Sequence, residues 1–324
     1  MTRLGILSTA RINRPILAAA RALDGVEVAA VASRDEERAR AYAGEHRIER
    51  AYGSYEALLA DPELDAVYIS LPNSLHVPWS IRALEAGKHV LCEKPLSPDP
   101  AAVGQAFDVA EEAGLVLMEA FMYRHHPQTK KLAELVADGA IGELRLVSSC
   151  FSFSLTELAN IRLSAELEGG ALMDVGCYCV SGSRLLAGEP ERVYGEAVRA
   201  SSGVDVRFAG TLRFGGDVLA HFDCGFDLPR RSFLEAVGSD GSIRVANPWL
   251  VTDGSLELRR GDDVERIDAG SIDRYEAQLA NFAAATRGEE QPLLDRADAI
   301  NQSRSLAALL RSAAEGRPEP LDSR

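Results

Sequence analysis

Residues 4–33 read LGILSTARINRPILAAARALDGVEVAAVAS. The run Leu4–Ser8 is short and apolar, which predicts a buried strand, and Val26–Ser33 predicts a second strand of the same kind. Between them, Asn13–Leu23 has the spacing of an amphipathic helix. Two strands with apolar residues on both faces, joined by a helix, are typical of a parallel sheet with helices on both sides.

The same alternation continues through the first third of the chain. The expected helices and strands that follow are Asp35–His46, Ala66–Ser70, Val77–Glu85, Lys88–Cys92, Ala101–Ala113 and Leu115–Glu119. The pattern predicts an α/β fold whose first domain is a doubly wound, Rossmann-type parallel sheet.

The pattern changes after Tyr123. We expect helices near 128–138 and from Gly170 to about Leu186, strands at 144–154 and through 193–267, and two closing helices near 273–287 and 295–314. Successive strands without helices between them predict a large, mainly antiparallel open sheet in an α+β domain. The expected domains are therefore 1–123, which would bind the nucleotide, and 124–324, which would bind substrate and form oligomer contacts.

Composition narrows the class of protein. The 324-residue chain has a net charge of −14, which argues against nucleic acid as a general partner. It has no apolar run of about 20 residues and no signal-peptide pattern, so we expect no membrane partner. The five cysteines form no dense disulfide framework, so we expect a cytoplasmic location. The five cysteines lack metal-ligand spacing, and the adjacent His125 and His126 have no third ligand motif near them, so we expect no metal.

The turn after the first strand lies where dinucleotide-binding loops carry glycines. Ser8, Ala10 and Asn13 occupy the three glycine positions of the usual fingerprint. Serine and alanine are small enough for the backbone to approach a pyrophosphate at a helix N-terminus, and the hydroxyls of Ser8 and Thr9 add donors. We therefore expect residues 8–12 to bind the cofactor; the alternative is an ordinary strand–helix turn.

Ser33-Arg34 ends the second strand, about 20 residues beyond that loop, where NAD enzymes carry an acidic residue. A carboxylate would repel a 2′-phosphate, whereas a hydroxyl and a guanidinium would bind one. The position therefore favours NADP as the cofactor. The alternative for Arg34 is a solvated charge at the end of a strand.

Two stretches carry a family resemblance: Leu71-Pro72-Asn73-Ser74-Leu75-His76, and Gly87-Lys88-His89-Val90-Leu91-Cys92-Glu93-Lys94-Pro95-Leu96. Together they resemble the glucose-fructose oxidoreductase, inositol dehydrogenase and rhizopine-catabolism (Gfo/Idh/MocA) oxidoreductase family. The segments 118–127 and 169–179 are similar to a narrower branch, which holds dimeric dihydrodiol dehydrogenases, NADP-dependent D-xylose dehydrogenases and deoxysugar ketoreductases. The similarity runs from residue 3 to at least residue 180.

The resemblance implies a set of site residues. The catalytic group implied is Lys94, Asp174 and Tyr178. The cofactor-binding residues expected from the loop, the strand end and the resemblance are Ser8, Thr9, Ala10, Arg11, Ile12, Ser33, Arg34, Leu71, Pro72, Asn73, His76, Glu93, Lys94, Pro95, Arg124 and Arg162. Asp174 and Tyr178 also attract attention on physical grounds, because they lie four apart on an apolar helix and so share a face. A purely structural Asp–Tyr hydrogen bond is the alternative.

These features together predict an NADP-dependent oxidoreductase that moves a hydride between the nicotinamide and a CH–OH or C=O carbon of a sugar or cyclic polyol. Lys94 or Tyr178 would carry the hydroxyl proton, and which of them does so stays open. Polar groups expected near the substrate are Tyr123, Arg124, Asn160, Arg162 and Tyr178, with Phe121, Phe151 and Phe153 as its apolar side or, equally, as core residues.

Other functions on the same fold are a trans-dihydrodiol dehydrogenase, a non-catalytic NADP-binding regulator, a glycosidase with tightly held NAD, and a structural subunit. The intact Lys94, Asp174 and Tyr178 set argues against the regulator, and Ser33-Arg34 argues against the glycosidase. We also expect a homo-oligomer, most simply a dimer. The helices after residue 123 are enough to cover only one face of the open sheet, so a second copy would cover the other.

Overall fold

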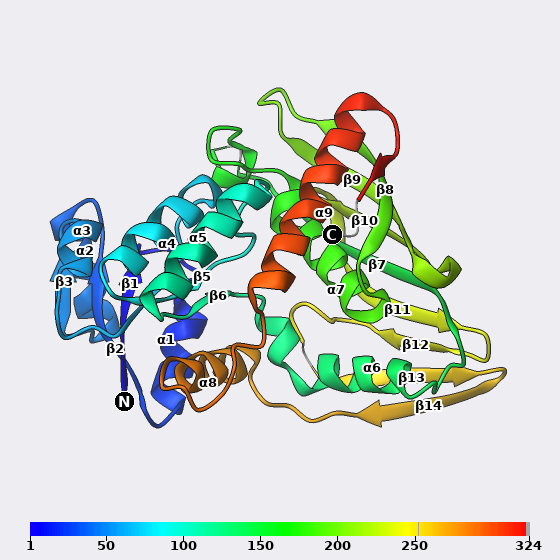
Figure 1. Cartoon of the computed structure of the whole chain (residues 1–324), viewed down its shortest axis with the longest axis horizontal. Coiled ribbons are helices and arrows are strands. Elements are labelled where there is room, and N and C mark those ends of the chain that lie inside the picture. The colour runs from blue at the N-terminus through cyan, green and yellow to red at the C-terminus, as the bar shows by residue number, and fades with distance from the viewer. Residues whose placement is uncertain (158, 252, 322–324) are drawn as a thin grey trace. The chain divides into compact units, whose positions relative to one another are not determined.

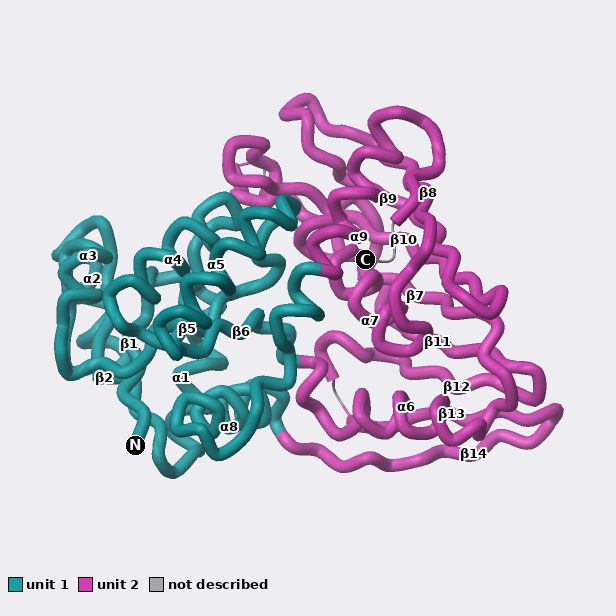
Figure 2. Tube along the Cα trace, viewed as in Figure 1, with its two compact units in different colours: residues 1–122, 273–300 teal, residues 123–272, 301–324 magenta. Residues whose placement is uncertain are grey.

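The computed structural model describes residues 1–157, 159–251 and 253–321, which form two compact units (Figure 2). Unit 1 comprises residues 1–122 and 273–300, and unit 2 comprises residues 123–272 and 301–324. This division differs from the single boundary expected near residue 123, because residues 273–300 return to unit 1. The return has a physical cause: helix α8 (Arg274–Thr286) buries Leu279 and Phe282 and packs against helix α1 (Asn13–Ala22).

In unit 1, the described strands form a six-stranded parallel sheet in the order β3-β2-β1-β4-β5-β6 (Figure 1). Its strands are β1 (Thr2–Leu7), β2 (Val26–Ala32), β3 (Arg50–Tyr52), β4 (Ala66–Ile69), β5 (His89–Cys92) and β6 (Leu117–Glu119). This order places the reversal of strand sequence between β1 and β4, where doubly wound folds bind dinucleotides. The expected Rossmann-type sheet is confirmed.

The remaining helices of unit 1 connect these strands. They are α2 (Glu36–His46), α3 (Tyr55–Leu59), α4 (His76–Glu85) and α5 (Pro100–Ala113), with a short 3₁₀ turn at Asn73–Leu75. Local signals explain their ends: Asp99 caps α5 through the backbone N–H groups of Ala101 and Ala102, and Gly114 ends it in a left-handed conformation. Helices α4 and α5 pack together, as do α1 and α8. Right-handed crossovers in the two directions from β1 put α1 and α4 on opposite faces of the sheet.

Unit 2 is built on a second sheet, whose described strands follow the order β14-β13-β12-β11-β7-β10-β9-β8-β15. Its strands are β7 (Leu144–Ser154), β8 (Pro190–Arg199), β9 (Asp205–Phe214), β10 (Leu219–Gly225), β11 (Asp227–Gly238), β12 (Ser242–Val245), β13 (Ser255–Arg260), β14 (Asp263–Asp268) and β15 (Glu319–Pro320). All neighbours are antiparallel except β7 and β10, which are parallel. The expected mainly antiparallel sheet is confirmed.

Helices cover one face of this second sheet. Helix α7 (Cys177–Ala187) contacts β7, β10 and β11, and α6 (Pro127–Ala137) contacts β13. The long helix α9 (Arg296–Glu315) precedes β15. On the other face, alternate residues of β9 and β10 are exposed, among them Arg207, Leu219 and His221. The sheet therefore has one face packed by helices of its own unit and one face that carries exposed polar and apolar side chains.

None of the helices in the described part of the chain is both long and apolar enough to cross a membrane. The same residues contain no cluster of three or more histidine, cysteine, aspartate or glutamate side chains that could hold a metal ion.

Candidate active site

The turn from β1 into α1 is held by polar side chains in place of glycines. Ser8 adopts a φ of 133°, a backbone conformation that favours glycine. Its hydroxyl lies 2.7 Å from the Ser70 hydroxyl and accepts from the Ala10 backbone N–H at 3.1 Å. Asn13 completes the cluster, because its Nδ2 donates to the Ser8 carbonyl at 2.9 Å and its Oδ1 accepts from Ser70 at 2.6 Å. The loop thus reaches a tight turn by a route different from the glycine fingerprint.

The N-terminus of α1 fits a pyrophosphate. Within the described residues, no side chain caps this helix, and its first turn contains no acidic residue. Thr9 and Ala10 are half-buried beside it, whereas Arg11 and Ile12 are exposed. The N–H groups of Asn13 and Arg14 donate to the carbonyls of Ala10 and Arg11, so the attraction for an anion comes from the positive end of the helix dipole.

The end of β2 fits the extra phosphate of NADP. The chain has an acidic residue here, Asp35, but its carboxylate caps α2 by accepting from the Arg38 backbone N–H at 3.0 Å. Arg34 is exposed. Burial raises the pKa of Tyr55, and the nearby guanidinium groups of Arg34 and Arg38 act in the opposite direction. Two cations therefore lie near one hydroxyl at this strand end. The sequence analysis missed Arg38, although its position one helical turn after Arg34 is a local signal.

The turn that carries Lys94 follows β5 and is held by buried side chains. Tyr68 donates to Glu93 Oε1 at 2.6 Å, and Glu119 Oε1 accepts from the Leu96 backbone N–H at 2.9 Å. Lys94 itself is half-buried. Since parallel strands place their carboxyl ends at one edge of a sheet, this turn shares that edge with Ser8, Ser33 and the Leu71–Asn73 turn.

His76 is placed differently from the other predicted cofactor residues. It is 1% exposed, its Nδ1 lies 2.8 Å from the Pro95 carbonyl oxygen, and its Nε2 lies 2.8 Å from the Leu71 carbonyl oxygen. Burial lowers the pKa of His76 to about 4 against the opposing effect of the two carbonyls. The ring of His76 is therefore buried between the backbone carbonyls of two turns, whereas the other predicted cofactor residues of unit 1 line the sheet edge.

Helix α8 brings a further aromatic residue to this region of unit 1. Burial raises the pKa of Tyr275 to about 12, with a contribution from the nearby Glu93, while Lys94 acts in the opposite direction. Tyr275 is 5% exposed. Sequence reasoning missed it because it lies about 180 residues after Lys94 along the chain and belongs to no motif near it.

In unit 2, the helix that carries Asp174 and Tyr178 is not regular at its start, which corrects the simple i, i+4 picture. Leu172–Gly176 form one turn of π-helix before α7 begins at Cys177, and the Cys177 N–H reaches back to the Leu172 carbonyl. Asp174 accepts from Arg162 Nε at 2.6 Å, and Asn160 Oδ1 accepts from the Arg162 backbone N–H at 3.1 Å. A π-turn of this kind often marks a functional site.

The ring of Tyr178 lies in an aromatic cluster. Its centroid is 5.7 Å from that of Tyr123, 5.5 Å from Phe151 and 5.9 Å from Trp249. Trp249 is fully buried and donates to the Cys150 carbonyl at 2.9 Å, while Tyr123 donates to the Ser181 hydroxyl at 2.8 Å. Packing on three sides fixes the direction of the Tyr178 ring. Trp249 had no sequence signal, because it lies in a turn 71 residues after Tyr178.

The structure thus gathers the predicted residues into two groups, one in each unit. The residues at the carboxyl edge of the first sheet belong to unit 1, and Arg124, Arg162, Asp174 and Tyr178 belong to unit 2, where Arg124 Nη1 donates to Ser181 at 3.3 Å. Of the three phenylalanines, Phe121 is fully buried, Phe151 packs on Tyr178, and Phe153 packs on Phe226.

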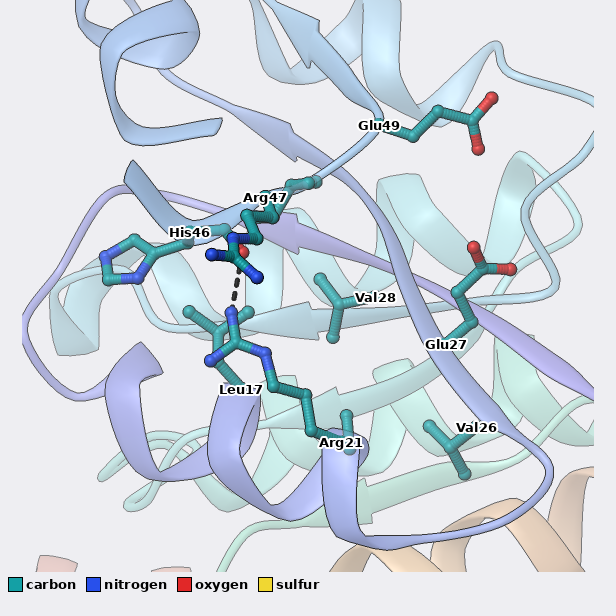
Figure 3. Close-up of a pocket in the computed structure, with 10 residues that line it drawn as sticks. Leu17, Arg21, Val26, Glu27, Val28, His46, Arg47 and Glu49 are labelled. Atoms are coloured by element: carbon teal, nitrogen blue, oxygen red, sulfur yellow. Dashed lines mark hydrogen bonds between the residues drawn. The ribbon is translucent and has the colours of Figure 1, made fainter. Parts of the chain in front are cut away.

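A pocket of about 350 Å³ lies elsewhere in unit 1 (Figure 3). Its lining comes from α1, the first residues of β2 and the segment after α2: Leu17, Ala20, Arg21, Val26, Glu27, Val28, His46, Arg47, Ile48 and Glu49. Because Val26–Val28 begin β2, the pocket lies at the amino end of that strand, away from the edge that carries Ser33 and Arg34. It contains none of the predicted site residues.

Comparisons with known proteins cover both units. Residues 2–121 match the family described as "Oxidoreductase family, NAD-binding Rossmann fold", and residues 129–244 match the "GFO/IDH/MocA C-terminal domain". D-xylose 1-dehydrogenase (NADP(+)) 2 of Haloferax volcanii is 43% identical, over 98% of this chain and 99% of the relative. The trans-1,2-dihydrobenzene-1,2-diol dehydrogenase of Danio rerio is 35% identical, over 77% and 76%.

Among solved structures, a 3-ketoreductase from Actinomadura kijaniata in complex with NADP and TDP-benzene has a TM-score of 0.91 and 32% identity. The match covers 96% of this chain and 97% of the reductase.

Proposed function

We propose that this chain, which belongs to the oxidoreductase family that combines an NAD-binding Rossmann fold with a GFO/IDH/MocA C-terminal domain, uses Lys94, Asp174 and Tyr178 to handle the proton of its substrate's hydroxyl. The chain is an NADP-dependent oxidoreductase that acts on the CH–OH or C=O carbon of a sugar or cyclic polyol. NADP, when bound, accepts or supplies the hydride at its nicotinamide ring. The observation that carries the residue assignment is the Lys94 turn, which is held by buried contacts at the nucleotide-binding edge.

The chemistry assigned to the side chains is proton transfer. Free lysine and tyrosine have pKa values near 10. The pKa of one of these side chains must therefore be lowered for that group to act as a base near neutrality. The aromatic cluster of Tyr123, Phe151 and Trp249 packs around the ring of Tyr178, which is 5% exposed. We assign Asp174, which accepts a hydrogen bond from Arg162, the role of orienting Tyr178 on the same helical segment.

Replacement of Lys94 by alanine tests this assignment. We expect turnover to fall by roughly 10²–10⁴-fold, the span typical of losing a general acid–base group. Tyr178→Phe should cause a comparable loss if tyrosine carries the proton, and NADP binding should persist in that variant. Lys130→Ala, at an exposed position on α6, is the matched control and should leave turnover unchanged. Near-normal turnover of the Lys94 variant would contradict the assignment.

Within the sugar and polyol class, we propose a free or deoxygenated pyranose as the substrate. Arg124, Asn160 and Arg162 offer hydrogen bonds to hydroxyl groups. A panel of pentoses, hexoses, cyclitols, dihydrodiols and keto-sugars, assayed with NADP or NADPH by absorbance, tests this. Turnover of dihydrodiols alone would instead place the chain with the diol dehydrogenases.

We further propose a homodimer and a cytoplasmic location. The dimer is supported by the face of the second sheet away from α7, where Val198 and Leu219 are 48% and 46% exposed beside paired charges such as Arg207 and Asp227. A second copy of the same face could cover these apolar side chains by two-fold symmetry. The location rests on composition alone.

A further inference from the structure

We propose that His76 is a positioning residue that couples the cofactor turn Leu71–Asn73 to the turn that carries Lys94. The inference rests on the assignment of Lys94 made above and gives His76 a role through the main chain in place of direct cofactor contact. His76 opens helix α4, so its own position is set by that helix.

The contacts of the ring carry the inference. Its two nitrogens lie 2.8 Å from the Pro95 carbonyl, directly after Lys94, and 2.8 Å from the Leu71 carbonyl, at the start of the cofactor turn. The ring is 1% exposed, so no solvent separates it from either turn. One rigid side chain therefore spans the distance between two loops that belong to different strands.

The other buried side chains at the Lys94 turn have different partners. Tyr68, which contacts Glu93, lies within β4, and Glu119, which contacts Leu96, lies within β6, so both attach the turn to the sheet. His76 differs because it joins the Lys94 turn to a second loop at the edge. A shift of the cofactor turn is thus transmitted to Lys94 through His76.

The protonation state makes this link sensitive to substitution. Burial lowers the pKa of His76, so the neutral ring prevails near neutral pH and donates through a single N–H. The neutral ring donates to one of the two carbonyls, and its other nitrogen carries a lone pair that forms no hydrogen bond with the second carbonyl, so packing alone holds that second contact. A glutamine can replace the donor but lacks the rigid ring, and a misplacement of about 1 Å can reduce turnover by roughly 100-fold.

The experiment compares His76→Gln and His76→Asn in the unmodified chain and in a Lys94→Ala background. Three quantities are measured for each full-length protein: the melting temperature without cofactor, the dissociation constant for NADP by fluorescence or calorimetry, and kcat and KM. His89→Gln is the control, because His89 begins β5 at the opposite end of the same strand, where its Nδ1 accepts from the Val116 N–H.

We expect the His76 variants to lower kcat by about 10- to 100-fold in the unmodified chain and by less than about 3-fold when Lys94 is already absent. NADP binding should weaken by at least about 3-fold, and His89→Gln should leave both quantities near normal. An equal loss of kcat in both backgrounds, or unchanged NADP affinity, would overturn the coupling.

The two assignments fail in different ways. If Lys94→Ala alone keeps normal turnover, the catalytic role of Lys94 is wrong. A lower melting temperature with kcat and NADP affinity unchanged would instead show that His76 only stabilises the fold. If His76→Gln does not fold, the shorter His76→Asn, which retains a donor, provides the same comparison.

Discussion

Ser8 shows how a residue other than glycine can occupy the tight turn of a phosphate loop. Its φ of 133° is expected to cost about 1–3 kcal/mol for a residue with a side chain. The hydroxyl offsets part of this cost, because it forms hydrogen bonds with the Ser70 hydroxyl and the Ala10 N–H that a glycine, which has no side chain, could not form. Asn13 then donates to the Ser8 carbonyl, so the turn is defined by three polar side chains, two from strand ends and one from the start of α1.

Arg34 is expected to decide between the two nicotinamide cofactors. A charge-assisted hydrogen bond to the 2′-phosphate contributes about 1.5–3 kcal/mol, or roughly 10- to 150-fold in affinity. Arg34→Ala should therefore remove most of the preference of kcat/KM for NADP and spare the use of NAD. Arg38, which also lies near Tyr55, should leave a small residual preference.

The control for this experiment is Arg40→Ala, since Arg40 is an exposed arginine of the neighbouring helix α2 and pairs with Glu36 at 2.5 Å. It should leave the ratio of the two kcat/KM values unchanged. Equal turnover of the unmodified protein with NADP and NAD would show that the strand end does not recognise the phosphate.

Single residues were predictable where the signal is local. Ser33, Arg34 and Lys94 follow strands whose apolar runs are visible in the sequence, so their place at the sheet edge followed from the strand pattern. Tyr275 and Trp249 were not predictable, because their positions depend on how distant segments pack. No pattern within about ten residues of either indicates the contact.

At the scale of elements, the π-turn Leu172–Gly176 is the feature on which Asp174 and Tyr178 depend. Gly176 lies at its end, and a Cβ there would meet Cys224 Sγ at 2.8 Å and Leu172 Cδ1 at 2.9 Å. Gly176→Ala should destabilise the fold by about 1–3 kcal/mol through overpacking. It should also lower kcat, because relief of the clash displaces the turn that carries Asp174.

Gly44→Ala is the matched control for Gly176→Ala. Gly44 lies within helix α2, where a Cβ would meet nothing within 4 Å. The same substitution should therefore stabilise the protein by about 0.5–1 kcal/mol and leave kcat unchanged. The two variants are compared by urea unfolding and by initial rates. Equal stability of both variants would mean that the π-turn can widen without cost.

Element prediction succeeded for segments marked by an apolar run, including the short strands β4, β5 and β6, and missed two short elements without such a run. The strand expected at Leu144–Ser154 matches β7, whereas the three-residue β3 and the five-residue α3 were missed. The return of α8 to unit 1 was also missed, because its apolar face fits any helix-covered sheet. Helix α8 packs on α1, and nothing in its own sequence indicates which helix it packs on.

At the scale of the whole molecule, the exposed face of the second sheet predicts association. Light scattering of the full chain at micromolar concentration should give the mass of a dimer. Leu219→Glu, placed at one of the exposed apolar positions of β10, should shift the mass toward that of a monomer, since a buried unpaired carboxylate is costly. Val264→Glu is the control, because Val264 is equally exposed but lies on the edge strand β14. A monomeric mass for the unmodified chain would refute the dimer.

Both units should be sensitive to acid, and for the same reason. Burial lowers the pKa of His76 in unit 1 to about 4 and that of His125 in unit 2 to about 3, from an ordinary value of 6.5. Between pH 6.5 and the lowered pKa values, the two histidines are protonated in the unfolded chain but remain neutral in the folded chain. The free energy of unfolding therefore falls as the pH falls. Asp205 acts the other way, because burial raises its pKa.

The loss should amount to about 2 kcal/mol for each of the two histidines between pH 7.5 and pH 5, since one pKa unit corresponds to about 1.4 kcal/mol. Urea unfolding at the two pH values measures it. His125→Gln should abolish the part of this loss of unfolding free energy that arises in unit 2 and leave the part that arises in unit 1. His221→Gln, at an exposed position on β10, should change neither part. A denaturation midpoint that stays constant from pH 7.5 to pH 5 would show that both imidazoles accept protons within the folded units, and that the carbonyls facing His76 hold its charged form.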